Sequence, residues 1–204
     1  MKKTNTAIGY LLLAGVLLFT GCVRLWRGHI EQKTYLLSVE RRQPMLKKPK
    51  GRVLWIDRVN TLPPYNVRSL IIKKGSSEYT ASYYNELLIS PSENVRNVFF
   101  NWFVDSGIFE DTTLYNPKEM SHRLSVSLLE MYIDDSTGEP RQVVVTLKVA
   151  LIEETSGKIL LNRNYKQSVS VDKIGVDAEA EVKALNKAFE LILEECENDI
   201  IKAL

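Results

Sequence analysis

The chain has 204 residues, of which 45% are apolar and 25% charged, and these proportions are typical of a globular domain and exclude an intrinsically disordered chain. It carries 27 Lys and Arg against 25 Asp and Glu; Lys2 and Lys3 lie in a leader that is predicted to be removed, which leaves 25 basic and 25 acidic residues. A neutral mature chain disfavours nucleic acid as a partner, because proteins that neutralise phosphates carry a surplus of Lys and Arg. The two cysteines, Cys22 and Cys196, exclude a disulfide-rich scaffold.

Residues 1–21 are predicted to be a lipoprotein signal peptide. The uncharged apolar run at residues 7–20 is shorter than the about 20 residues that a membrane-spanning helix needs. It ends in Phe19-Thr20-Gly21-Cys22, which resembles a bacterial lipobox. The resemblance implies that the leader is cut before Cys22 and that this residue carries an S-diacylglycerol and an N-acyl chain such as palmitate. Two alternatives remain: an uncleaved N-terminal anchor helix, and a chance cysteine beside an ordinary cleavage site.

Residues 22–33 are predicted to be a lipidated tether. Arg24 and Arg27 suit anionic headgroups and Trp26 suits the membrane interface, and a plain disordered spacer explains them equally well. The resemblance to lipoproteins implies that an Asp after the acylated cysteine favours retention in the inner membrane. Because Val23 stands at that position, we expect the periplasmic face of the outer membrane in preference to the inner membrane.

Residues 34–204 are predicted to form one α+β domain. It is an α/β sandwich in which a mostly antiparallel sheet packs against two helices, the longer one C-terminal. Short runs rich in strand formers, several of them alternating in polarity, predict seven strands: residues 34–39, 52–59, 69–73, 78–81, 124–133 with a bulge near residue 128, 143–151 and 159–165.

Two segments carry helix signals. Ser90, Pro91 and Glu93 form an N-terminal capping box, and Gly107 is a plausible stop for that helix. Residues 177–204 carry an apolar stripe with the acids outside it. Cys196 falls on this stripe and is predicted to be a small buried hydrophobe.

The loop from Arg41 to Lys50 lies between the first two predicted strands and holds five cations without an acid. Such a loop could contact an anionic lipid surface or an acidic partner. A charge run in a loop is usually solvated, and we expect that outcome here.

The sequence contains no recognisable catalytic or metal-binding constellation. His29 and His122 stand alone, whereas a metal site needs clustered ligands. We therefore expect neither an enzyme nor a cofactor other than the covalent lipid. Two pairs of acids are adjacent in the sequence, Asp134-Asp135 and Glu153-Glu154. Adjacent side chains on a strand point to opposite faces, so neither pair can act as an acid/base pair there.

After the lipobox, the predicted elements follow the order strand, hairpin, helix, meander and terminal helix. This order and several short segments are shared with a known family. These are Tyr35-Leu36-Leu37, residues 53–59 followed by Leu62-Pro63-Pro64-Tyr65, residues 71–75, and Tyr83-Tyr84-Asn85. Over nearly its whole mature length the chain resembles the ABC-type transport auxiliary lipoproteins, which include PqiC-like membrane-integrity lipoproteins. The resemblance implies an accessory protein of a lipid-moving machine whose other chains are an ATPase, a permease and a mammalian-cell-entry-type protein that bridges the periplasm.

The competing interpretation is an outer-membrane lipoprotein that regulates a periplasmic enzyme such as a peptidoglycan synthase. Such a regulator is expected to have a long disordered tether, whereas only about a dozen residues separate Cys22 from the first predicted strand. The short tether favours the transport interpretation, with the mammalian-cell-entry-type protein as the expected partner. A homo-oligomer stays open.

Five residues are predicted to contact that partner: Pro63, Pro64, Tyr65, Tyr83 and Tyr84. They lie beside chain irregularities and outside the regular apolar stripes. Tyrosine is common at protein interfaces because its large apolar ring carries a polar tip. The alternative is that these tyrosines cap the core beneath the hairpin.

Overall fold

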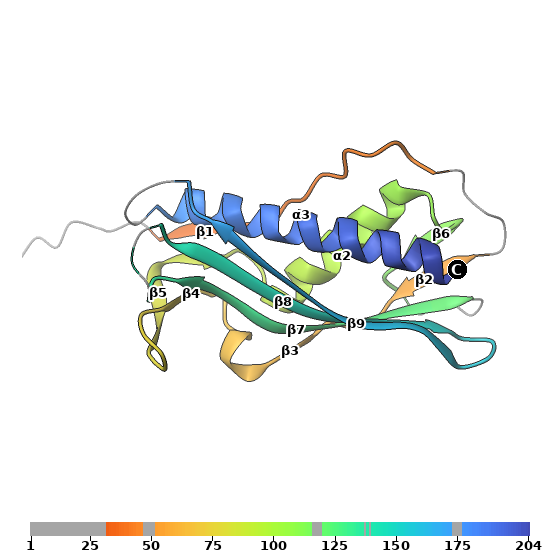
Figure 1. Ribbon diagram of the computed structural model, residues 1–204, viewed down its shortest axis with the longest axis horizontal. Helices are drawn as coiled ribbons and strands as arrows, with labels where there is room; N and C mark the ends of the chain where they lie inside the picture. The colour runs from red at the N-terminus through yellow and green to blue at the C-terminus, as the bar shows by residue number, and fades with distance from the viewer. Residues whose placement is uncertain (1–31, 47–51, 116–119, 137, 139, 173–176) are drawn as a thin grey trace, which may run out of the picture. The chain divides into compact units, whose positions relative to one another are not determined.

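The computed structural model describes residues 32–46, 52–115, 120–136, 138, 140–172 and 177–204 (Figure 1). The predictions for the leader, for Cys22, for His29 and for nearly all of the tether fall outside these residues, as does the second half of the basic loop. In the described part of the chain, no helix combines the length and the apolar character that crossing a membrane requires.

A long antiparallel meander forms the centre of the sheet. Strand β7 (His122–Asp134) pairs with β8 (Gln142–Glu153), and β8 pairs with β9 (Lys158–Ser170). The register of β7 against β8 shifts between Leu128 and Glu130, which confirms the predicted bulge. Because the bulge adds one residue, the side chains of β7 that belong to the hydrophobic core change from even positions, up to Leu128, to odd positions, Met131 and Ile133.

The other edge of β7 is occupied by three short strands in succession, all parallel to it: β2 (Val53–Ile56), β3 (Asn60–Thr61) and β4 (Ser69–Lys73). Three more strands extend the sheet outward: β6 (Asp111–Thr113) beside β2, β5 (Tyr79–Leu87) antiparallel to β4, and β1 (Lys33–Tyr35) parallel to β5. The α+β prediction is confirmed. The sheet is mixed, since its long pairings are antiparallel and its short ones mostly parallel.

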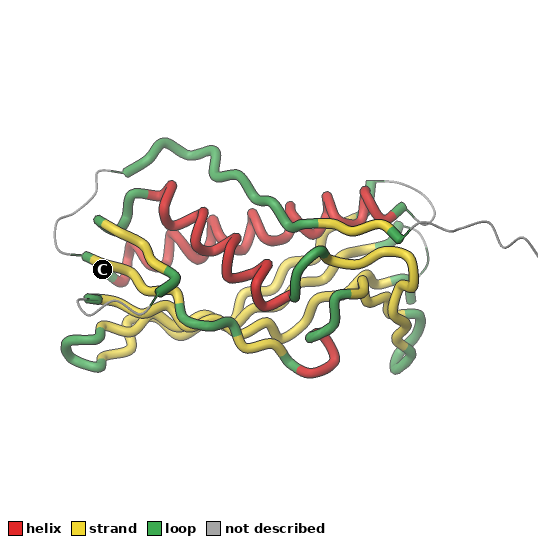
Figure 2. The backbone as a smooth tube through the Cα atoms, turned by 180° about the vertical axis from the view of Figure 1, so that it is seen from behind, coloured by secondary structure: helices red, strands yellow, loops and turns green. Residues whose placement is uncertain are grey.

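Both helices cover the same face of the sheet (Figure 1 and Figure 2). Helix α2 (Pro91–Ser106) begins where the capping box predicts, because Ser90 accepts a hydrogen bond from the Glu93 amide at 3.3 Å. It ends at Gly107, whose φ of 70° is left-handed. Helix α3 (Ala178–Ala203) covers β8 and β9. Cys196 is fully buried on its inner face, as predicted.

The expectation that the acids of α3 lie outside its apolar stripe is wrong for Glu181 and Glu197, which are 2% and 7% exposed. Each carboxylate faces a buried guanidinium. Arg141 pairs with Glu181, and Arg41 pairs with Glu197 at 2.8 Å. Burying these acids is tolerated because the opposite charge is buried with them.

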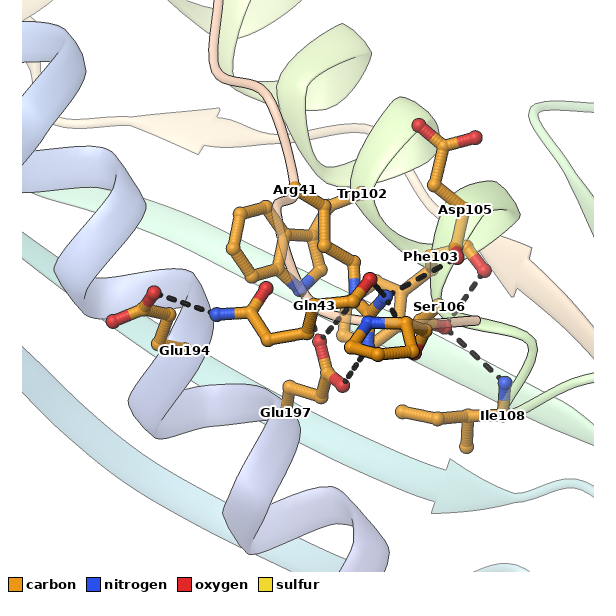
Figure 3. A network of polar contacts seen from close by, with 10 residues as sticks. Arg41, Gln43, Trp102, Phe103, Asp105, Ser106, Ile108, Glu194 and Glu197 are labelled. Atoms are coloured by element: carbon orange, nitrogen blue, oxygen red, sulfur yellow. Dashed lines mark hydrogen bonds and ion pairs between the residues drawn. The ribbon is translucent and has the colours of Figure 1, made fainter. Parts of the chain in front are cut away.

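The expectation that the basic loop is solvated is therefore wrong for its first residue, Arg41, whose side chain is 2% exposed. Arg41 lies in the segment that follows β1, residues 36–46, which we call the strap. The strap runs across both helices and reaches the end of α2, where the amide of Leu46 donates to the carbonyl of Ser106 (Figure 3). The amide of Leu37 donates to Asn94 of α2 at 3.2 Å, and that of Ser38 donates to Asn186 of α3 at 3.1 Å. The strap thus holds the two helices together.

Candidate functional site

The prolines predicted to break the chain form a short 3-10 helix, η1 (Pro63–Tyr65), between β3 and β4. It lies on the face of the sheet opposite to α2 and α3 (Figure 2). Neither proline has an N–H to donate to a strand, and Leu62 before them is extended, with φ −61° and ψ 139°. The turn is closed by the amide of Asn66, which donates to the carbonyl of Pro63 at 3.2 Å.

Three tyrosines from three elements meet beside η1. The ring of Tyr65 stacks on that of Tyr132 from β7, with centroids 6.3 Å apart and planes at 22°. Tyr79 of β5 meets the ring of Tyr132 edge-on, at 5.8 Å and 85°. Edge-on and offset stacked pairs are the arrangements that aromatic rings prefer. Lys73 Nζ lies 5.6 Å from the Tyr132 centroid, within the range of a cation–π contact.

A groove of about 430 Å³ lies against this cluster. Its lining is uncharged and comes from η1, from β4 and from the start of β5: Pro64, Tyr65, Val67, Ile71, Tyr79, Thr80 and Ala81. Apolar side chains are unusually open here, since Val67 is 42% exposed and Tyr79 is 45% exposed. We call this site the tyrosine groove.

The hydroxyl of Tyr65 stays protonated in this setting. Burial raises the pKa of Tyr65 to about 12, and the neighbouring Tyr79, Glu130 and Tyr132 add to the effect. Tyr65 can therefore donate a hydrogen bond at any physiological pH. The groove offers a ligand apolar surface and hydroxyl groups, without a formal charge in its lining.

The charged residues nearest the groove are paired with one another. Glu130 accepts hydrogen bonds from Thr146 at 2.6 Å and from Lys166 at 3.2 Å, and the bond from Thr146 is the main cause that lowers the pKa of Glu130. Lys73 pairs with Asp134 at 3.2 Å. Each of these four charged side chains thus has an opposite charge beside it.

The structure separates the five predicted interface residues into two places. Pro64 and Tyr65 line the tyrosine groove, and Pro63 is the exposed first residue of η1. Tyr83 and Tyr84 do not line the groove; they lie in a bulge of β5 and are 82% and 41% exposed. An exposure of 82% rules out the alternative that Tyr83 caps the core.

Sequence reasoning missed five lining residues: Val67, Ile71, Tyr79, Thr80 and Ala81. Strand alternation could have pointed to three of them. Ile71 pairs with Ala81 in the hairpin, and Tyr79 lies two residues from Ala81, so all three side chains face the same side of the sheet. Val67 lies in a loop, where no periodic pattern applies.

His122 does not line the groove. It is 6% exposed, and its Nδ1 lies 2.8 Å from the hydroxyl of Ser121. Burial lowers the pKa of His122, and the positive charge of Arg52 lowers it further. The imidazole is therefore held in its neutral form beside a hydroxyl that also bonds to the backbone of β2.

The adjacent acids each have their own partners. Asp134 pairs with Lys73 and Asp135 with Lys74, while Glu154 pairs with Arg123. Glu153 accepts a hydrogen bond from Ser156. Among the residues that the structure describes, no three His, Cys, Asp or Glu side chains gather in a way that could hold a metal ion.

Comparisons with known proteins yield matches in structure and none in sequence. No family model matches the chain, and no curated protein matches it. A Xanthomonas campestris protein assigned to family DUF330 superposes with a TM-score of 0.67 at 11% identity, covering 80% of this chain and 92% of its own. An uncharacterised protein superposes with the same TM-score at 15% identity, covering 83% of this chain and 99% of its own.

Looser matches include a minor lipoprotein from Acinetobacter baumannii, with a TM-score of 0.38 at 10% identity, covering 74% of this chain and 92% of its own. A score of that size supports no inference about function. What the comparisons establish is the architecture: the described domain has the fold of the DUF330 protein over most of both chains.

Proposed function

We propose that this chain is a non-catalytic lipoprotein, anchored through Cys22 to the periplasmic face of the outer membrane, that serves as an accessory component of an ABC-type lipid transport system. The lipobox-like Phe19-Thr20-Gly21-Cys22 supports the anchor. The resemblance to the transport auxiliary lipoproteins supports the assignment to a lipid transporter. In this proposal the chain works by binding a mammalian-cell-entry-type periplasmic protein.

The observation that carries the proposal is the tyrosine groove. Interface cores are depleted of charged side chains and enriched in tyrosine, and the lining of the groove has both properties. Pro63 and Pro64 fix the shape of η1 before any partner arrives, so less conformational entropy is lost on binding. At about 430 Å³ the groove also falls within the range of about 300–1,000 Å³ typical of ligand-binding clefts.

The groove favours an apolar segment of a partner protein as its occupant. Such a segment would bury the exposed faces of Val67 and Tyr79 and would lie beside the hydroxyls of Tyr65 and Tyr79, which are hydrogen-bonded to each other. A strongly charged segment would lose its hydration without gaining an opposite charge in the lining.

Co-purification of the acylated protein with its partners tests the proposal. Tyr79→Ala and Val67→Asp alter the groove at positions that are already half-open, so folding should be retained. Truncating an aromatic residue at the centre of an interface typically costs at least about 2 kcal/mol, or about 30-fold in affinity. Tyr115→Ala is the matched control, because Tyr115 is 85% exposed and follows β6, which lies beside β2 near the start of β7, whereas the groove lies beside β4 near the end of β7.

We expect the mammalian-cell-entry-type protein to be captured by the parent protein and by Tyr115→Ala, and to be lost from both groove variants although both remain folded. Full recovery of that partner by Tyr79→Ala and Val67→Asp would refute the role of the groove. Capture of a peptidoglycan synthase in its place would support the regulatory interpretation and contradict the transport proposal.

A further inference from the structure

The exposed tyrosines of β5 lie beside the point where the chain enters the domain. The first residue of β1, Lys33, pairs with Asn85, which directly follows Tyr84. Neighbouring strands are about 4.8 Å apart, so the backbone at Lys33 runs next to the bulge (Figure 1). Lys33 is also only 11 positions after Cys22 (33 − 22), a stretch that spans at most about 40 Å when fully extended.

The bulge itself raises the tyrosines out of the sheet. Ser69 pairs with Glu86 and Ile71 with Ala81, so one residue of β4 stands opposite four of β5, residues 82–85. The hydroxyl of Ser82 accepts hydrogen bonds from the backbone and side-chain nitrogens of Asn85, both at 3.2 Å, and closes the bulge.

Within the bulge, Tyr83 and Tyr84 form a packed pair that is open to solvent. Their ring centroids are 4.9 Å apart with planes at 82°, and the two residues are 82% and 41% exposed. The only acid next to the pair along β5, Glu86, is paired with Arg68 at 2.7 Å. The pair therefore offers an apolar surface with polar tips and no uncompensated negative charge from its own strand.

We propose that Tyr83 and Tyr84 insert into the headgroup region of the membrane to which the acylated Cys22 holds the chain. Tyrosine favours this region because its ring enters the acyl boundary while its hydroxyl stays hydrated. The exposed Lys33 beside the pair favours a surface with anionic lipids. The proposal rests on the proposed function, because it needs the lipid anchor to hold the domain at the bilayer.

Insertion of the tyrosine pair fixes the orientation of the tyrosine groove. Tyr79 lines the groove and precedes Tyr83 by four residues on the same strand, which corresponds to roughly 13 Å at about 3.3 Å per residue. The groove is thereby held just above the headgroups, where a partner that approaches the membrane can reach it.

Quenching by brominated lipids tests the insertion. The full acylated protein carrying Trp26→Phe is reconstituted into vesicles of phosphatidylethanolamine and phosphatidylglycerol, with or without bromine on the acyl chains. Tyr83→Trp reports on the bulge, and Tyr84→Trp repeats the measurement at the second ring. Tyr115→Trp is the matched control, since Tyr115 is 85% exposed and follows β6 near the start of β7, whereas β5 lies beside β4 near the end of β7. Trp55 and Trp102 are common to all variants.

We expect brominated lipids to reduce the emission of Tyr83→Trp and Tyr84→Trp and to leave that of Tyr115→Trp unchanged. Equal emission changes in all three variants would overturn the proposal, as would a Tyr83→Trp signal that responds only when a partner protein is added. Flotation with the vesicles distinguishes a failure of the lipid anchor from a failure of the tyrosine insertion. Protein that fails to float contradicts the lipid anchor, whereas protein that floats without selective quenching contradicts the insertion alone.

Discussion

Replacing Glu197 tests how firmly the strap holds the domain together. The carboxylate of Glu197 accepts hydrogen bonds from Arg41 Nε at 2.9 Å, from Arg41 Nη2 at 2.8 Å and from Trp102 Nε1 at 2.7 Å (Figure 3). Glu197→Ala leaves a buried guanidinium and a buried indole N–H without this partner. Removing one member of a buried ion pair costs about 3–5 kcal/mol, and in a domain of this size each kcal/mol lowers the melting temperature by about 2–4 °C, so we expect a fall of about 6–20 °C.

The measurement is thermal unfolding of the purified protein, followed by circular dichroism. Glu194→Ala is the control, because Glu194 lies on the same helix and contacts the same strap, where it accepts a solvent-exposed hydrogen bond from Gln43 at 2.7 Å. Surface changes of that kind alter the free energy of unfolding by less than about 0.5 kcal/mol. Equal unfolding midpoints for Glu194→Ala and Glu197→Ala would show that the buried ion pair does not hold the strap.

A double replacement tests the physical reason for the loss. Arg41→Met combined with Glu197→Leu removes both buried charges together and fills their space with apolar groups. Replacing both members of a buried pair by apolar residues is often neutral or stabilising. We therefore expect the double variant to be more stable than Glu197→Ala alone. Its remaining losses are the acceptor of the Trp102 indole and the Arg41 donor to the solvent-exposed carbonyls of Gln43, Pro44 and Asp105. A double variant less stable than the single one contradicts this reasoning.

Three further outcomes are expected. Gly107→Ala should lower the melting temperature much more than Gly157→Ala. Both glycines have φ of 70°, but only at Gly107 would an added Cβ collide with backbone, namely the carbonyl oxygen of Leu46. The melting temperature should fall as the pH drops below about 6.5, because burial lowers the pKa of His122 and the unfolded chain binds the proton first; His122→Phe should flatten that slope. Mass spectrometry of the membrane fraction should find Cys22 acylated at the mature N-terminus, and Cys22→Ala should leave an unprocessed precursor.

Signals that act over a few residues allowed the sequence to predict much of the fold. The capping box at Ser90, the stop at Gly107 and the bulge near Leu128 are all confirmed, because each depends on neighbours in the chain. Strand limits were less accurate. The strand predicted at residues 34–39 ends at Tyr35, since the chain leaves the sheet there to form the strap.

Contacts between distant parts of the chain could not be predicted in the same way. Arg41 and Glu197 are 156 positions apart, so neither the basic loop nor the apolar stripe indicates that the two charges are buried together. The same reason applies to the parallel pairing of β2, β3 and β4 with β7, which no local pattern specifies.

The candidate site was predicted in part. Pro63 and Pro64 were recognised as a bend because proline restricts the backbone wherever it occurs. The separation of Tyr65 from Tyr83 could not be foreseen, because it depends on a four-residue bulge in β5, a strand that was predicted to end at residue 81 and continues to Leu87.

The sharing of one edge of β7 by three short strands has a consequence for how this architecture can diversify. The central strand fixes the register of β2, β3 and β4 independently, so the connections between them are free to change in length without shifting the core. Residues 62–68, which contain η1, are one of these connections. A new binding preference could therefore be grafted by exchanging a seven-residue cassette, while the scaffold that displays it keeps every strand pair in place.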